Sequence, residues 1–142
     1  MFSENDPGIE VDVSNFPLVI QRVGAVIDDA QMARYLEALE ALLARKQPFA
    51  SITIVKRRGH LERSTISAYG EFTKRHEEAM REHYKGAAFV FPGEVFRLVL
   101  SAIIAVSPAK VPYKVFSKQD EAYAWAAALI SYNPRTAPIL WP

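Results

Sequence analysis

Five basic side chains near the middle of the chain form its densest positive cluster: Lys56, Arg57, Arg58, His60 and Arg63. An apolar run that predicts a strand precedes them, and an amphipathic helix is predicted after them. In open α/β sheets, the carboxyl end of a parallel strand and the start of the next helix form the usual ligand-binding edge. We therefore expect this loop to contact an acidic surface or a phosphate group on a partner. The alternative is an ordinary solvated loop, because charge clusters of this size are common.

Patterns typical of metal, nucleophile and cofactor sites are not found in the sequence. The chain has no cysteine, which excludes disulfides, thiolate nucleophiles and cysteine metal clusters. His76 and His83 are two helical turns apart, about 10 Å along the axis, which is too far to share one ion. Neither a glycine-rich dinucleotide loop nor a phosphate-binding loop is present. We expect no catalytic residue, no metal and no cofactor, and therefore a protein that is not an enzyme.

Composition limits the size of the fold and the classes of partner. A chain of 142 residues with 50% hydrophobic content predicts a single domain, 1–142, with a full core. With 17 basic and 16 acidic side chains, the net charge gives no reason to expect a nucleic acid or an anionic membrane as partner. The acidic N-terminal segment does not resemble a secretory signal, so we expect a cytoplasmic protein. The longest apolar run is well short of the roughly 20 residues that span a bilayer, so no membrane span is expected.

Hydrophobic periodicity predicts strands that alternate with helices. Strands are expected at 9–13, 18–23, 49–55, 87–91 and 111–116, and helices at about 29–46, 65–86, 94–107 and 117–130. Asp28 is the expected N-cap of the first helix, Gly86 the end of the second and Ser117 the N-cap of the last. The order β-β-α-β-α-β-α-β-α predicts an α/β fold with a mostly parallel sheet, an N-terminal hairpin and helices packed on the sheet.

The two ends of the chain are expected outside this regular pattern. Residues 1–8 are predicted to form a loose tail. Residues 131–142 contain three prolines, so they cannot continue the last helix, yet they carry Ile139, Leu140 and Trp141. We expect this C-terminal tail to lie against a groove.

The predicted helix around 95–106 is apolar on nearly all sides, although covering one sheet face requires only one apolar stripe. We expect an apolar interface, possible in a homodimer, that involves Phe96, Leu100, Ile103 and Ile104 of this helix with Leu140 and Trp141 of the tail. The tail residues Leu140 and Trp141, a second subunit or an apolar ligand are candidates to cover it. Burial by neighbouring helices of the same chain is the ordinary alternative.

The segment VPYKVFSKQDEAYAWAAALI (111–130) combines a strand with a helix that opens with acidic residues and carries Ala124-Trp125. This ending and the order of elements resemble SpoIIAA-like proteins of the STAS superfamily, the sulfate transporter and anti-sigma factor antagonist domains. The resemblance implies a STAS-like fold and a non-enzymatic, partner-binding regulatory role. Relatives of the CRAL-TRIO type imply an alternative function, a small carrier of lipids or other apolar ligands.

In anti-sigma factor antagonists, a regulatory serine is phosphorylated at the loop entering the helix after the central strand. The resemblance therefore makes Ser64 and Thr65 candidate phosphorylation sites, and free amides at a helix N-terminus would favour a phosphate there. The alternative is that Ser64 or Thr65 is simply an N-cap.

Overall fold

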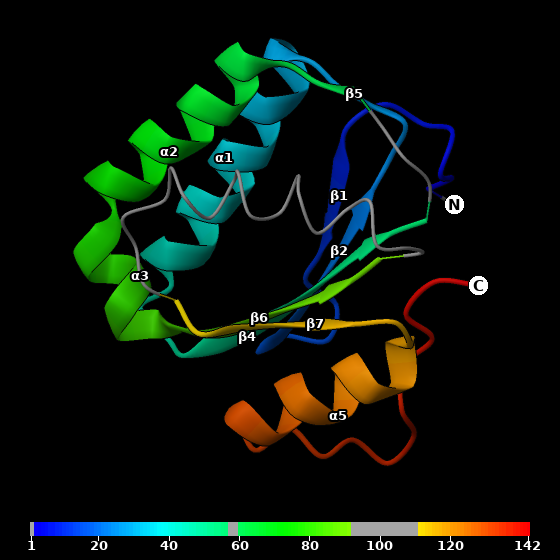
Figure 1. Cartoon of the computed structure of the whole chain (residues 1–142). Coiled ribbons are helices and arrows are strands. Elements are labelled where there is room, and N and C mark those ends of the chain that lie inside the picture. The colour runs from blue at the N-terminus through cyan, green and yellow to red at the C-terminus, as the bar shows by residue number, and fades with distance from the viewer. Residues whose placement is uncertain (1, 57–59, 92–110) are drawn as a thin grey trace.

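The computed structural model of this chain describes residues 2–56, 60–91 and 111–142. Its elements alternate as the periodicity predicts (Figure 1). In chain order they are β1 (Ile9–Asp12), β2 (Leu18–Val23), β3 (Val26–Ile27), α1 (Asp29–Ala44), β4 (Phe49–Val55), β5 (His60–Leu61), α2 (Arg63–Arg75), α3 (Glu77–His83), β6 (Tyr84–Val90), β7 (Tyr113–Phe116) and α5 (Gln119–Leu129). The predicted helix at 94–107, with Phe96, Leu100, Ile103 and Ile104, lies outside the described residues.

A five-stranded sheet forms the middle layer, in the order β1-β2-β4-β6-β7. β1 pairs antiparallel with β2, as the predicted hairpin requires, and every other pair in this sheet is parallel. β3 and β5 pair in parallel as a separate two-stranded sheet that the periodicity did not predict. The predicted mostly parallel α/β architecture is confirmed.

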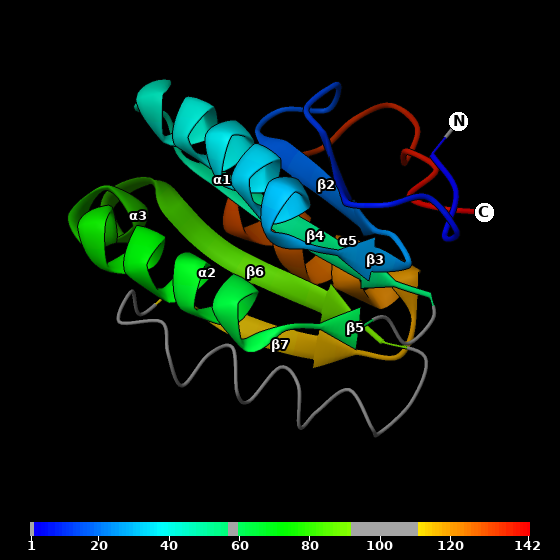
Figure 2. The same cartoon turned by 90° about the horizontal axis from the view of Figure 1, so that it is seen from above.

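The helices are divided unequally between the two faces of the sheet. α1, α2 and α3 cover one face and α5 covers the other, as Figures 1 and 2 show. This division follows from the handedness of parallel connections: β2, β4 and β6 are added in one direction, and right-handed crossovers then place their helices on the same side. α5 comes after β7 and packs across β4, β6 and β7 from the opposite side.

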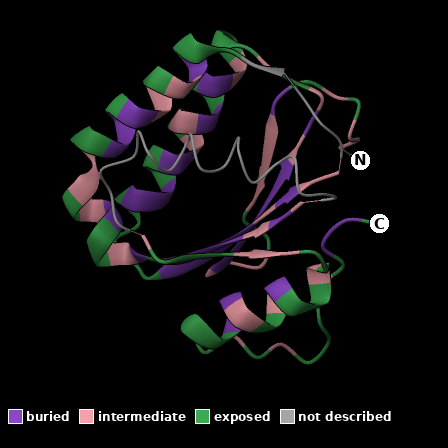
Figure 3. Ribbon diagram, in the orientation of Figure 1, coloured by how far each residue is buried: buried purple, intermediate pink, exposed green. Residues whose placement is uncertain are grey.

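The core has two layers because strand side chains alternate between the faces. Val19 packs with Met32 and Leu39 of α1, whereas Leu18 and Ile20 pack with the α5 side chains. β4 is buried along nearly its whole length at the centre of the sheet, which explains its continuous apolar sequence (Figure 3). α1 begins where the sequence predicts, since the Asp28 carboxylate accepts a hydrogen bond of 2.8 Å from the Gln31 amide.

Two predicted element boundaries are wrong. The helix expected at 65–86 is divided at His76 into α2 and α3 and ends at His83, and β6 already begins at Tyr84. Gly86 therefore lies inside a strand, directly beneath Trp125 and Leu129 of α5, where a side chain would overlap Leu129. The last helix has Lys118 rather than Ser117 at its N-cap position, with no side-chain cap bond.

Residues 2–8 are attached to the body, so the expectation of a loose N-terminal tail is wrong. The Gly8 amide donates to the Val26 carbonyl at 2.7 Å, and the Ala25 amide donates to the Asp6 carbonyl at 2.9 Å. This close approach requires glycine at position 24, where a Cβ atom would overlap the Asp6 carbonyl oxygen and lie 3.0 Å from the Gly8 oxygen. Within the described ranges, no helix is long and apolar enough to cross a membrane.

Replacing Gly24 with alanine is expected to destabilise the fold by about 1–3 kcal/mol, because the new methyl group meets backbone that cannot move independently. Gly86→Ala is the matched control: its nearest obstacle is the tip of Leu129, which is 41% exposed and can rotate away. Urea unfolding of both variants measures the difference. Equal loss of stability in the two would contradict the close packing at Gly24.

Candidate partner-binding surfaces

The carboxyl edge of the parallel sheet brings together the starts of α1 and α2 with the basic residues. Lys56 follows the last residue of β4, and Arg63 is the first residue of α2. The Ser64 hydroxyl donates to the Asp29 carboxylate at 3.0 Å, so the first turns of α2 and α1 lie side by side. Arg57 and Arg58 lie outside the described residues. His60 is in β5, where its backbone pairs with Val26 of β3.

Ser64 and Thr65 differ in accessibility, although they are neighbours in the first turn of α2. Ser64 is exposed, whereas Thr65 is fully buried and its hydroxyl has no hydrogen-bond partner among the described residues. Glu62 occupies the N-cap position, so the expectation that Ser64 or Thr65 caps the helix is wrong. Only Ser64 is accessible to a modifying enzyme in this arrangement.

Lys56 points toward the C-terminal tail, although the sequence placed it in the basic loop. Its ammonium nitrogen lies 4.9 Å from the centre of the Trp141 ring, a cation–π contact. The edge of the sheet and the tail are therefore in contact.

The C-terminal tail packs onto the α5 face of the sheet, in agreement with the expectation that it lies against the body of the domain. Leu140 and Trp141 are 5% and 6% exposed and join the apolar cluster of that face. The same cluster contains Leu18, Ile20, Ala50, Ile52 and Ile54 of the strands and Ala122 and Ala126 of α5. We call this surface the tail groove. Ile139, beside the two buried residues, remains 79% exposed.

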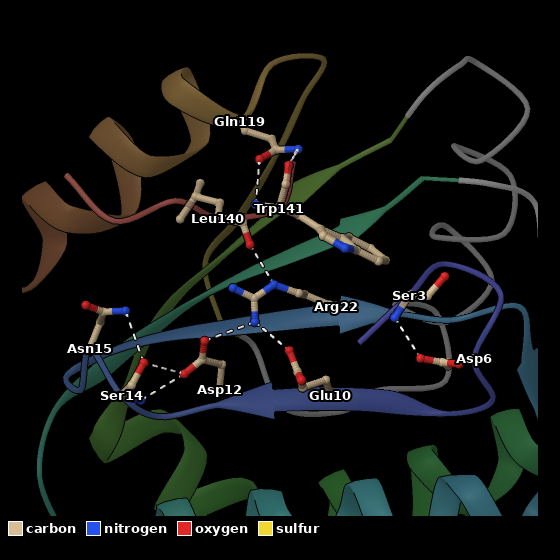
Figure 4. A network of polar contacts seen from close by, with 10 residues as sticks. All are labelled: Ser3, Asp6, Glu10, Asp12, Ser14, Asn15, Arg22, Gln119, Leu140 and Trp141. Carbon is tan, nitrogen blue, oxygen red and sulfur yellow. Dashed lines mark hydrogen bonds and ion pairs between the residues drawn. The ribbon is translucent and has the colours of Figure 1, made fainter. Parts of the chain in front are cut away.

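Gln119 binds the main chain of the tail at two points. Its side-chain amide donates to the Trp141 carbonyl at 3.0 Å, and its side-chain oxygen accepts from the Trp141 amide at 3.2 Å (Figure 4). Phe2 lies against the Trp141 ring with centroids 6.1 Å apart. Both chain ends therefore meet at this groove.

A buried arginine ties the tail to the edge of the sheet. The side chain of Arg22, 7% exposed, donates from Nε to the Leu140 carbonyl at 2.6 Å. Its Nη1 contacts Glu10 at 2.5 Å and Asp12 at 3.0 Å, both on the neighbouring strand β1 (Figure 4). A guanidinium with this geometry satisfies its buried charge with two carboxylates and a carbonyl.

The Asp12 carboxylate on β1 accepts hydrogen bonds from Ser14 as well as from Arg22. Burial by itself would raise the pKa of Asp12, but hydrogen bonds from Ser14 and the ion pair with Arg22 lower it below its ordinary value of 3.8. The Ser14 amide and hydroxyl donate to Asp12 at 2.9 Å and 2.6 Å. Hydrophobic periodicity did not predict this network. The residue that could have indicated it is Arg22, a charged residue in the apolar strand LVIQRV that lies directly opposite Glu10 in the hairpin register.

The face of the sheet that α1, α2 and α3 cover contains a second group of buried polar side chains. Gln21 accepts hydrogen bonds from Tyr35 at 3.1 Å and from Thr53 at 2.8 Å, and Ser51 is bonded to Tyr84. Burial raises the pKa of Tyr69 to about 12 and raises the pKa values of Tyr35 and Tyr84 well above the ordinary range. These phenols remain protonated near neutral pH, and the Tyr35 hydroxyl donates its hydrogen bond to Gln21.

His76, between α2 and α3, contacts side chains and backbone of neighbouring helices. His76 stacks on Phe72 with ring centroids 4.1 Å apart, and its Nδ1 lies 3.0 Å from the Phe72 carbonyl. Its Nε2 lies 3.8 Å from Glu40 of α1. In the part of the chain that the structure describes, no three His, Asp or Glu side chains are placed to hold a metal ion.

Comparisons with known proteins support the fold alone. No protein-family model matches the sequence. A search of curated proteins gives no match either. The structure is similar to that of an uncharacterized protein of the DUF3478 family from Shewanella loihica PV-4, which has a SpoIIAA-like fold. The TM-score is 0.65 at 16% sequence identity, over 89% of this chain and 99% of that one. The chain therefore has a SpoIIAA-like fold, which confirms the expected STAS-like architecture.

The Arg22 network predicts sensitivity to acid. Because the pKa of Asp12 is lowered in the folded state, its contribution to stability is present above pH 3.8 and is lost as the pH falls through its folded value. Asp12→Asn is expected to destabilise the protein at pH 7 but to flatten the loss of stability between about pH 5 and pH 2. Thermal unfolding across this range measures it, with the exposed Glu71→Gln as control. A wild-type loss no steeper than that of Asp12→Asn would contradict the network.

A negative charge at Ser64 is expected to weaken the contact between α1 and α2. Ser64→Glu replaces a hydrogen-bond donor with a carboxylate facing Asp29, at an expected cost of about 1 kcal/mol. The same substitution in an Asp29→Asn background should be neutral or slightly stabilising, because a negative charge then only meets the helix N-terminus. A double-mutant cycle measured by urea unfolding tests the pair. No coupling between the two positions would show that this contact carries no energy.

Proposed function

We propose that this protein is a non-enzymatic interaction and regulatory domain that binds an acidic surface of a protein partner at the carboxyl edge of its sheet. The observation that carries the proposal is the exposed first turn of α2, in which Arg63 and the accessible Ser64 lie beside the start of α1 on a SpoIIAA-like fold. The N-termini of α1 and α2, with Lys56 and Arg63, favour an acidic partner at this edge, although Asp28, Asp29 and Glu62 also lie there. We place its action in the cytoplasm.

Regulation through Ser64 follows from the same geometry. The wild-type hydroxyl is bonded to Asp29, so a phosphate on Ser64 would bring two negative groups together at the α1–α2 contact. Phosphorylation would therefore change both the charge of the binding edge and the spacing of the helices. Phosphate found by mass spectrometry only at other residues of the purified protein would contradict this regulation.

Matched charge-removing variants test the binding edge. A photo-crosslinking residue at Glu62, which is exposed at the start of α2, identifies the partner in cells, and binding of that purified partner is then measured. The triple variant Arg57→Ser, Arg58→Ser and Arg63→Ser is expected to weaken binding about tenfold, since a surface charge contact with a partner contributes about 0.2–1 kcal/mol.

The control removes the same charge at the opposite end of the strands, in Lys74→Ser, Arg75→Ser and Lys85→Ser. It should bind as tightly as the wild type. Equal effects of the two triple variants, or no effect of the first, would contradict the proposed edge. Native mass spectrometry adds a separate check: a co-purified mass of lipid size would favour the apolar-ligand carrier instead, and a dimer would indicate self-association.

A further inference from the structure

We propose that the tail groove is a peptide-recognition site for an extended segment that carries an aliphatic residue followed by tryptophan, and that Leu140 and Trp141 occupy it as an internal ligand. This inference concerns the α5 face and not the basic edge, so it goes beyond the proposed function. The intended occupant in trans is a partner peptide of the same chemistry as the tail. The contacts of the tail provide the template for that peptide.

The groove binds peptide main chain rather than apolar side chains alone. Gln119 uses both ends of its side-chain amide on one residue, and Arg22 donates to the preceding carbonyl (Figure 4). Together these bonds fix the direction and register of an extended segment over two residues. Simple core packing of a chain end does not require such bonds at consecutive residues.

The side-chain positions are also specific. Leu140 belongs to a cluster of aliphatic strand residues, and the Trp141 ring contacts both Phe2 and the Lys56 ammonium group. An aromatic ring at the second position gains a cation–π contact that an aliphatic residue cannot make. Ile139, 79% exposed, contributes little to this recognition.

The segment that connects the occupant to α5 is suited to release. Between Tyr132, which is bonded to Ala127 and Asn15, and Leu140, most residues are exposed. The tail is therefore attached at two points with an exposed connection between them.

A gain-of-binding experiment on the full chain tests the site. Leu140→Ser with Trp141→Ser removes the internal ligand and leaves Arg22, Gln119 and Lys56 in place. A fluorescein-labelled peptide of sequence RTAPILWP, residues 135–142, is titrated against this variant and the wild type by fluorescence anisotropy. The variant is expected to bind the peptide, and the wild type should bind at least about tenfold more weakly, because its own tail competes at a high effective concentration.

Peptide and protein controls give the specificity. A peptide with the Ile139→Ser change should bind equally well, whereas Leu140→Ser or Trp141→Ser in the peptide, or Gln119→Ala in the double-serine protein, should abolish binding. A folded double-serine variant, verified by circular dichroism, that does not bind the peptide would overturn the proposal. If the wild-type protein instead forms dimers by exchanging tails, the occupant in trans is a second copy of this chain, and the proposal of a separate partner peptide is overturned.

Hydrogen exchange on the wild type provides a test that does not depend on the folding of the variant. The Trp141 amide should exchange by local release, at least about tenfold faster than the Ile52 amide in the central strand. Exchange of both amides at the same slow rate would show that the tail leaves only when the whole domain unfolds, which would overturn the proposal.

Discussion

The handedness of parallel β connections is the constraint on which the rest of this structure depends. β2, β4 and β6 are added to the sheet in one direction, so their helices gather on one face. The other face is left to the part of the chain that follows β7. A helix of 11 residues packs mainly on β4, β6 and β7. Leu140 and Trp141 of the tail, with Phe2, complete the apolar cluster of this face beside α5.

Arg22 shows how this side of the sheet is held without a helix. A buried guanidinium is costly unless its charge is paired, and the partners of Arg22 come from two places, β1 and the tail. Removing a partner leaves a buried donor of the guanidinium without its acceptor. The network therefore makes the edge strand and the tail depend on each other, although they are more than 110 residues apart in sequence.

Local sequence patterns predicted the fold well where the deciding interactions were local or where burial was continuous. The apolar run of β4, the hairpin and the Asp28 cap are all read within a few residues. The division at His76 was missed because apolar residues continue with helical spacing through Phe72 and Met80. β6 begins at Tyr84 because that ring stacks on Phe49 of β4, 4.7 Å away, a contact between distant residues that periodicity cannot report.

Site residues were predicted less completely for the same reason. The position of Ser64 beside Asp29 requires the packing of two helices, and the burial of Thr65 depends on which side of its helix faces the core. The basic loop was a correct signal of the sheet edge, but the contact of Lys56 with Trp141 joins residues 85 positions apart. The Arg22 network was within reach of the sequence, since the register of the hairpin places Arg22 opposite Glu10.

The strand order also has a consequence for synthesis on the ribosome. The strands of the main sheet lie side by side in the order in which they occur in the chain. Each newly synthesised strand can therefore pair with the edge of the strands already made while the chain emerges. During that growth the guanidinium of Arg22 has its two carboxylates but lacks the carbonyl of Leu140. The nascent domain would thus present a partly satisfied arginine beside an incompletely covered apolar face until residue 140 is added.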